Sequence, residues 1–184
     1  MQINDEGWLQ DVEIIPSPNF NERPDSANIR LVVVHGISLP PGEYGGGYVQ
    51  QLFTNQLDPQ QHEYFEQIKD LQVSAHCFIS RPGKLIQFVS FNKRAWHAGI
   101  SSWKGVDNCN DFSIGIEMEG SDEESYEQQQ YQLLAKLVIS LRKQYPAILE
   151  QSICAHSDIA PGRKTDPGPL FDWHKFNQLI NQSV

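Results

Sequence analysis

The most informative segment of the chain for its architecture reads Arg30-Leu31-Val32-Val33-Val34-His35. A short run of aliphatic and β-branched residues without polar alternation is typical of a strand that is buried on both faces. Strands of that kind lie at the centre of parallel or mixed sheets that are covered by helices. We therefore predict a central strand that ends at His35.

The rest of the chain alternates between strand and helix patterns. We predict further strands over residues 72–80, 84–91, 112–119 and 152–156, the first two forming a hairpin that turns at Arg81-Pro82-Gly83. We predict helices over residues 48–57, 60–71, 127–145 and 173–180. Because crossover helices and a hairpin occur together, we expect an α/β (α+β) fold with a mixed central sheet flanked by helices. We expect one domain that covers residues 1–184.

Two of the predicted helices carry end signals. Ser125 and Gln128 have the spacing of a capping box for the helix over residues 127–145, and Pro146 ends it. Asp172 precedes the last helix as a predicted N-cap.

The composition excludes several classes of partner. The 184 residues include 14 Lys and Arg against 23 Asp and Glu, which gives a net charge of −9. Nucleic-acid binding depends mostly on Lys and Arg, so we expect no nucleic-acid partner. The N-terminal residues lack the pattern of a secretory signal, and no apolar run approaches the length of a membrane span. With three cysteines and no CxxC pair, these features predict a cytoplasmic protein without a membrane partner.

The candidate catalytic and metal-binding residues lie at or after the ends of predicted strands. His35 and His156 each close a strand pattern, and Asp166 follows ten residues after His156. Two imidazoles and a carboxylate suit a catalytic zinc with an open position, and they also suit non-haem iron. A single histidine at the end of a strand is more often an ordinary hydrogen-bonded residue than a ligand. Spacing alone does not bring these three residues together.

Glu117 and Lys164 are further candidates. Glu117 shares its strand face with Ser113 and Gly115, which are too small to fill a core and leave room for a cleft floor. A solvated strand face explains the same pattern. Lys164 precedes Asp166 by two residues and can direct a positive charge at an oxyanion, although an ordinary surface lysine is the alternative.

Five blocks of the sequence, in order along nearly the whole chain, carry a family resemblance. They read VVHGISLPPG (33–42), VSAHC (73–77), RAWHAG (94–99), NDFSIGIE (110–117) and HSDIAPGRKTDPG (156–168). Together they resemble the zinc amidases of the peptidoglycan-recognition and phage-lysozyme amidase superfamily. Within it, the chain is most similar to the cytoplasmic amidases that act on 1,6-anhydro-N-acetylmuramyl-L-alanine.

The resemblance implies specific roles for the candidates. His35, His156 and Asp166 match the ligands of one Zn²⁺ ion, Glu117 matches the catalytic carboxylate, and Lys164 matches the lysine that stabilises the oxyanion. Phage and animal members often carry cysteine as the third ligand, so the carboxylate of Asp166 favours the cytoplasmic branch.

The resemblance also implies substrate contacts at Tyr64, Trp96, His97 and Asn108. Trp96 and His97 match a wall of the substrate cleft, and Tyr64 matches an aromatic residue on a helix beside it. A loop anchored by a buried tryptophan and simple core packing are the respective alternatives. Enterobacterial members have arginines for the stem-peptide carboxylates at the positions of Gln72 and Asn108, and neither residue is charged here.

The expected function is hydrolysis of the amide between anhydro-N-acetylmuramic acid and L-alanine, by a monomer, on small anhydro-muropeptides from recycled cell wall. One alternative is a non-catalytic peptidoglycan-binding module. Members of that kind have usually lost a ligand, whereas all three matching positions are filled here. A secreted amidase that acts on intact wall is the other alternative, and the absence of a signal pattern opposes it.

Overall fold

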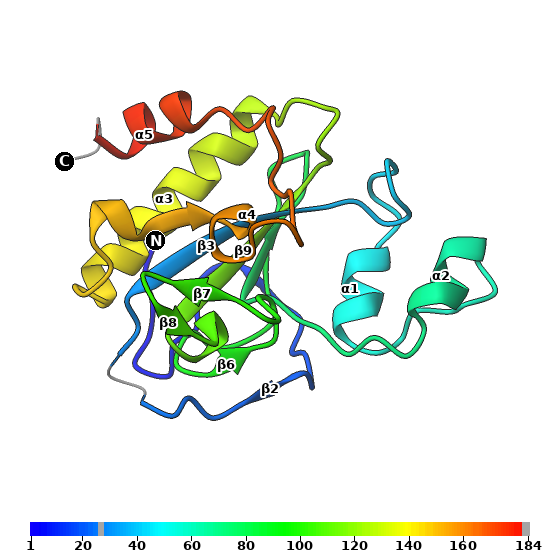
Figure 1. Ribbon diagram of the computed structural model, residues 1–184, viewed down its shortest axis with the longest axis horizontal. Coiled ribbons are helices and arrows are strands. Elements are labelled where there is room, and N and C mark those ends of the chain that lie inside the picture. The colour runs from blue at the N-terminus through cyan, green and yellow to red at the C-terminus, as the bar shows by residue number, and fades with distance from the viewer. Residues whose placement is uncertain (26–27, 182–184) are drawn as a thin grey trace.

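A mixed central sheet runs through the structure (Figure 1). The structure is a computed structural model and describes residues 1–25 and 28–181, so the predicted single domain of residues 1–184 includes five residues outside this range. Within the described residues the sheet has six strands in the order β1-β5-β4-β9-β3-β10. Their bounds in that order are Glu13–Ile14, Leu85–Gln87, Cys77–Ile79, Ser113–Glu119, Leu31–Ile37 and Ile153–Ala155.

The pairing of these strands is mostly parallel. β1 pairs with β5, β4 with β9, β9 with β3, and β3 with β10 in parallel, whereas β4 and β5 form the antiparallel hairpin. The predicted mixed sheet and its hairpin are therefore confirmed. Two small antiparallel pairs lie outside the sheet: β2 (Phe20–Asn21) with β6 (Arg94–Ala95), and β7 (Ser102–Trp103) with β8 (Val106–Asp107).

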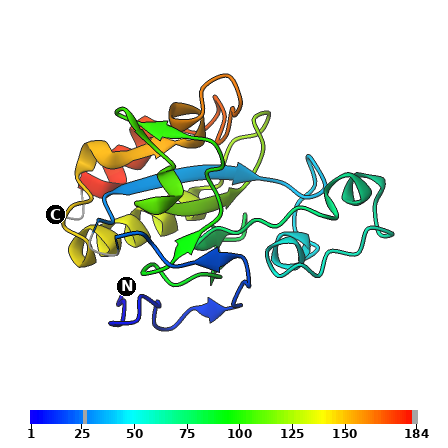
Figure 2. The ribbon, with the colours of Figure 1, turned by 60° about the horizontal axis from the view of Figure 1, so that its bottom comes forward.

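The helices lie in two places. α3 (Gln128–Gln144) and α5 (Trp173–Asn181) cover one face of the sheet (Figure 1). α1 (Tyr48–Phe53) and α2 (Glu63–Ile68) project beyond the sheet in both ribbon views (Figure 2). We call residues 48–68 the arm. The short elements are η1 (Cys109–Asp111), η2 (Glu150–Ser152) and α4 (His156–Ile159).

The two central strands are buried on both faces. Val32 and Val34 of β3 pack with Ile114, Ile116 and other apolar residues under α3 and α5. The opposite face of β9 carries small or polar side chains, although all seven residues of that strand are buried. The predicted burial of the central strand is thus confirmed, and polar groups on its second face are enclosed rather than solvated.

The N-terminus of α3 differs from the prediction. The capping box is formed by Glu127 and Gln130, not by Ser125 and Gln128. Glu127 still has an extended backbone (φ −77°, ψ 151°), so Ser125 lies two residues ahead of the helix cap and does not reach the first helical N–H groups. The predicted end before Pro146 is confirmed.

Several other predicted elements are shorter than expected. α1 and α2 each have six residues, and residues 72–76 and 88–91 do not belong to the strands of the hairpin. β10 ends at Ala155, so the prediction that His156 belongs to this strand is wrong by one residue. The chain turns there because the backbone N–H of Ala155 donates to the carboxylate of Asp158. Among the described residues, no helix combines the length and apolar character that a bilayer span requires.

The packing of α3 on the sheet provides a test of the core. Leu137 is fully buried between α3 and the sheet, whereas Gln132 on the same helix is exposed. Leu137→Ala removes buried methyl groups and is expected to lower the free energy of unfolding by about 2–5 kcal/mol. Gln132→Ala is the control and is expected to stay within about 0.5 kcal/mol of the unsubstituted protein. Urea unfolding measures both, and equal values for the two variants would contradict this packing.

Candidate metal centre

The register of β3 against β9 creates the first pair of polar residues. His35 lies directly opposite Glu117 in this parallel pairing, on the face that is not covered by α3. The Nδ1 atom of His35 is 3.9 Å from Oε1 of Glu117. Because strand neighbours share a face, the pairing holds an imidazole and a carboxylate side by side near the carboxyl ends of both strands.

Two further residues come from the segment that follows β10. β10 pairs with β3 on the side away from β9, and His156 is the first residue of α4 directly after it. Asp166 lies in the loop after α4, where its backbone carbonyl accepts the N–H of Ser157. The sheet order therefore brings residues 121 positions apart, His35 and His156, to the same place.

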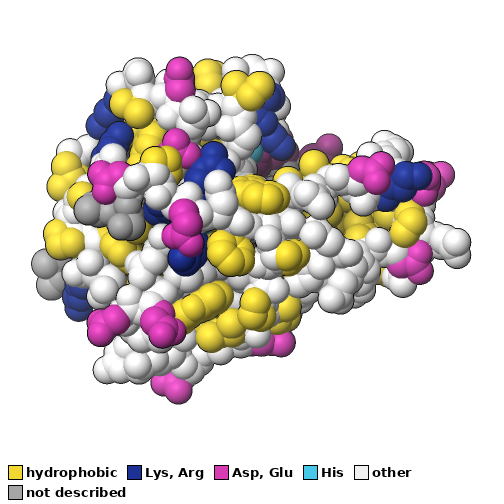
Figure 3. All heavy atoms as spheres, turned by 90° about the horizontal axis from the view of Figure 1, so that it is seen from below, with side chains coloured by type: hydrophobic (Ala, Val, Ile, Leu, Met, Phe, Trp, Pro, Cys, Tyr) yellow, Lys and Arg dark blue, Asp and Glu magenta, His cyan; other side chains and the backbone are white. Residues whose placement is uncertain are grey.

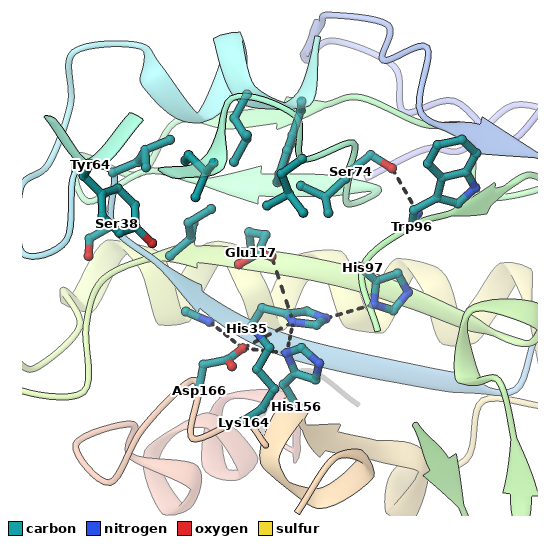
Figure 4. Close-up of a pocket in the computed structure, with 18 residues that line it drawn as sticks. His35, Ser38, Tyr64, Ser74, Trp96, His97, Glu117, His156, Lys164 and Asp166 are labelled. Carbon is teal, nitrogen blue, oxygen red and sulfur yellow. Dashed lines mark hydrogen bonds and ion pairs between the residues drawn. The ribbon is translucent and has the colours of Figure 1, made fainter. Parts of the chain in front are cut away.

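The three predicted metal ligands converge on one point (Figure 4). The Nδ1 atoms of His35 and His156 are 2.9 Å apart, and Oδ2 of Asp166 lies 3.3 Å and 3.0 Å from them. A tetrahedral zinc ion with ligands at about 2.0–2.1 Å places those ligand atoms roughly 3.3 Å from one another. The triangle of two nitrogens and one oxygen therefore has the size and the donor set of a site that can hold a metal ion.

The outer ring nitrogens show which atoms face this point. Nε2 of His156 donates to the carbonyl oxygen of Ala98 at 3.2 Å, which leaves its Nδ1 with a free lone pair. Nε2 of His35 lies 2.9 Å from Nδ1 of His97. Metal-binding imidazoles commonly have their second nitrogen held in this way, because the hydrogen bond selects the tautomer.

Burial sets the protonation of the cluster. Burial lowers the pKa of His35 to about 4, so the imidazole is neutral at pH 7 and available to a metal. Burial alone raises the pKa of Asp166, but the contacts of its carboxylate with the imidazoles of His156 and His35 outweigh this effect and leave the pKa below its usual range. The cluster thus combines the neutral imidazole of His35 and the carboxylate of Asp166 with the imidazole of His156.

Glu117 has the opposite shift. Burial raises its pKa well above the usual value and the charge of Asp166 raises it further, while Lys164 lowers it. Its Oε2 atom is buried and makes no hydrogen bond to any described residue. A basic carboxylate with a free, enclosed oxygen has the properties of a group that exchanges protons with a bound molecule.

A cavity of about 230 Å³ opens above these residues. Its polar floor comprises His35, His97, Glu117, His156, Lys164 and Asp166. The opposite wall is apolar and includes Ile37, Leu39, Leu52, Phe53, Tyr64 and Ile68, several of them on the arm. In the space-filling view, the arm projects from the body, and histidine surface is visible in the notch between them (Figure 3).

The remaining predicted site residues divide into two groups. Tyr64, Trp96 and His97 line the cavity, and the indole Nε1 of Trp96 is anchored on Asn21 at 2.8 Å. Asn108 does not line it; it borders a separate pocket with residues such as Ile100 and Arg163. The substrate contacts predicted for all four stay predictions.

Sequence reasoning missed two residues that surround the histidines. The side chain of Asn110 accepts the backbone N–H groups of His97 and Ala98, at 3.1 and 2.8 Å. Arg163 donates to the carbonyl of Ala98. Asn110 and Arg163 stand inside the blocks quoted above, but their residue types carry no signal of this role.

Comparison with known proteins agrees with this geometry. A family model described as N-acetylmuramoyl-L-alanine amidase matches residues 25–169. The chain belongs to this amidase family. It is similar to the 1,6-anhydro-N-acetylmuramyl-L-alanine amidase AmpD of Citrobacter freundii, with 54% identity over 179 residues that cover 97% of this chain and 95% of the relative.

Solved structures extend the comparison to the fold. The crystal structure of a selenomethionine AmpD derivative matches with a TM-score of 0.94 and 53% identity, covering 98% of this amidase and 99% of that chain. The amidase AmiD from Escherichia coli, solved with the substrate anhydro-N-acetylmuramic acid-L-Ala-D-gamma-Glu-L-Lys, matches with a TM-score of 0.61 and 28% identity. That match covers 96% of this chain and 65% of AmiD. The predicted family and fold class are confirmed.

A buried histidine beside the site makes the stability of this amidase dependent on pH. His76 is fully buried; the N–H of Gly115 donates to its Nδ1, and its Nε2 donates to the carbonyl of Lys93. Burial, followed by the charge of Arg23, lowers the pKa of His76 to about 3. Between pH 6.5 and 3, the unfolded chain therefore binds a proton that the folded protein does not bind, and the free energy of unfolding falls as the pH falls.

His76→Gln is expected to remove this contribution. One proton changes the free energy of unfolding by about 1.4 kcal/mol per pH unit, so the slope between pH 4.5 and 5.5 is expected to decrease by about that amount. Urea unfolding of the metal-free protein measures the slope. The control is His174→Gln, because His174 is exposed. Equal slopes for His76→Gln and the unsubstituted protein would contradict the assignment.

Proposed function

We propose that this amidase hydrolyses the amide bond between anhydro-N-acetylmuramic acid and the L-alanine of the stem peptide, with one Zn²⁺ ion held by His35, His156 and Asp166. The observation that carries the proposal is the convergence of three ligand atoms within 3.3 Å of one another beside Glu117. The substrate assignment is supported by 54% identity to an enzyme of that name over nearly the whole chain.

The donor set suits the metal and the reaction. When bound, zinc supplies a Lewis acid that polarises the amide carbonyl and lowers the pKa of a water molecule to about 7. His35 and His156 would contribute imidazole nitrogens, and Asp166 would contribute a carboxylate oxygen. Three protein ligands would leave a bound zinc ion able to take a further ligand from the cavity that these residues line.

Glu117 acts as the proton carrier. Its carboxylate takes a proton from the attacking water while the water oxygen forms a bond to the amide carbon. It then delivers that proton to the departing nitrogen as the C–N bond breaks. The second proton of the water also passes to this nitrogen, so the lactyl group ends as a carboxylate and L-alanine leaves with a protonated amine. Burial raises the pKa of Glu117, which makes its carboxylate a stronger base than that of an exposed glutamate.

Lys164 stabilises the negative charge that develops on the amide oxygen. It lines the cavity beside the metal cluster, and its charge lowers the pKa of Glu117, as expected for a cation close to this site. Tyr64 and Trp96, which line the same cavity, contact the substrate in this proposal.

The cellular role follows from the substrate class. Anhydro-muropeptides are small fragments of cell wall, so the proposed role is wall recycling in the cytoplasm. The proposal includes action as a monomer built on a single domain. Neither nucleic acid nor membrane is part of the proposal.

Two substitutions separate metal binding from proton transfer. Glu117→Gln is expected to keep one zinc ion per chain and to lower kcat by at least about 10³-fold, since the amide cannot accept the water proton. His35→Ala is expected to lose both metal and activity. Elemental analysis and mass spectrometry of the products of anhydro-N-acetylmuramyl-tripeptide measure both results, with exposed Glu150→Gln as the matched control.

The outcomes also decide between the alternatives. Turnover by a metal-free His35→Ala protein would overturn the proposal. Wild-type protein that binds the tripeptide without releasing peptide would point to a binding module. Faster release from intact wall sacculi than from soluble fragments would point to a wall amidase.

Lys164→Met tests the stabilisation of the oxyanion. Loss of one such group is expected to lower kcat by about 10²–10³-fold, because the lost interaction forms in the transition state. KM is expected to change little. Steady-state kinetics on the same tripeptide measure the effect, and exposed Lys136→Met is the control. A rise in KM with unchanged kcat would assign Lys164 to substrate binding instead.

A further inference from the structure

A chain of buried hydrogen bonds continues outward from His35. Nε2 of His35 lies 2.9 Å from Nδ1 of His97, and Nε2 of His97 lies 3.1 Å from the hydroxyl oxygen of Ser113 (Figure 4 shows the two imidazoles). His35, His97 and Ser113 are all buried. Both ring nitrogens of His97 are therefore engaged within the protein.

The strand under His97 is shaped for this ring. A Cβ atom at Gly115 of β9 would lie 2.4–2.7 Å from three atoms of the imidazole, closer than any side chain permits. Gly115 does not have a left-handed backbone, so the need for glycine here is space. The small residues Ser113 and Gly115 thus provide the hydrogen-bond partner and the room for one imidazole.

The backbone around His97 is held in place as well. Asn110 accepts the N–H groups of both His97 and Ala98. The carbonyl of Ala98 then accepts from Nε2 of His156 and from Nη2 of Arg163. Two adjacent residues consequently contact the outer nitrogens of both candidate ligands.

The donor and acceptor roles in the hydrogen-bonded chain His35–His97–Ser113 depend on which nitrogen of His35 binds the metal. A metal at Nδ1 of His35 requires the ring proton on Nε2, where the nearest acceptor is Nδ1 of His97. His97 in turn donates from Nε2 to the hydroxyl of Ser113, which accepts. Without His97, the Nε2–H of His35 would be buried without this acceptor, which disfavours the tautomer that binds metal.

We propose that His97 is a positioning residue for the metal centre: it holds the imidazole of His35 with Nδ1 directed at the metal, through the chain His35–His97–Ser113. The proposal rests on the proposed function, because it requires His35 to bind the metal. It assigns His97 a role that differs from the substrate contact implied by the family resemblance.

The test compares two substitutions of nearly equal size. His97→Asn can place an amide oxygen close to the position of Nδ1 and keep an acceptor for His35, whereas His97→Leu removes the acceptor. The leucine variant is expected to bind Zn²⁺ about 10–100-fold more weakly, and the asparagine variant to stay within about threefold of the wild type. Competition with a chromophoric chelator measures the affinity, and the visible spectrum of the Co²⁺-loaded protein reports the ligand geometry.

The outcomes separate this proposal from the function on which it rests. Failure of the wild-type protein to bind Zn²⁺ would reject the metal site itself. Wild-type affinity and an unchanged Co²⁺ spectrum in His97→Leu would reject the role of His97 alone, as would equal losses in the leucine and asparagine variants.

A second variant covers the case in which His97→Leu does not fold. Ser113→Ala removes one oxygen atom and the acceptor for Nε2 of His97, and it is expected to weaken Zn²⁺ binding in the same direction by a smaller factor. Unchanged affinity in Ser113→Ala, with the metal-free protein folded as judged by circular dichroism, would overturn the chain as a positioning device.

Discussion

The parallel pairing of β3 with β9 is the constraint on which the site depends. Its register places His35 opposite Glu117 and Val33 opposite Gly115, all on one face. A shift of one residue would turn these side chains into the apolar layer under α3, where charged and polar groups have no partners. The same hydrogen bonds that hold the sheet together therefore hold the imidazole beside the carboxylate.

The two faces of this strand pair have different functions. One face packs against α3 and α5 through a continuous apolar cluster. The other face combines a smaller apolar cluster, which includes Leu31 and Val33, with the polar residues of the cavity. The apolar packing on one face stabilises the sheet. The other face can therefore enclose groups such as Glu117, whose burial destabilises the fold but raises the pKa of the carboxylate for proton transfer.

The sequence patterns predicted the central strands, because each of these patterns follows from the burial of the strand itself. The valine run and the alternation around Glu117 indicate two central strands, since burial dictates both patterns. The pattern places the capping box of α3 at Ser125 instead of Glu127, because both residues stand three positions before a glutamine and only the backbone path selects one. The meeting of His35 with His156 depends on the strand order, which spacing along the chain does not reveal; family resemblance suggested it.

The hydrogen-bond partners of the histidines could not be predicted from the sequence either, because they also depend on the folded backbone. The small residues on one face of β9 predict the floor of a cleft, and in the structure Ser113 and Gly115 lie under His97, which lines the cavity. The orientation of an imidazole ring depends on the hydrogen-bond acceptors that the folded backbone places around it. The carbonyl of Ala98 is one such acceptor, and no residue type encodes it.

The arm belongs to a different apolar cluster from the strands that carry the polar floor. Val49, Leu52, Phe53 and Phe65 pack with the hairpin side of the sheet, away from the residues under α3. Changes in the arm can consequently reshape the apolar wall while leaving the imidazoles and carboxylates undisturbed. A division of this kind allows ligand preference to diverge among descendants of one ancestor while the reaction itself is inherited intact.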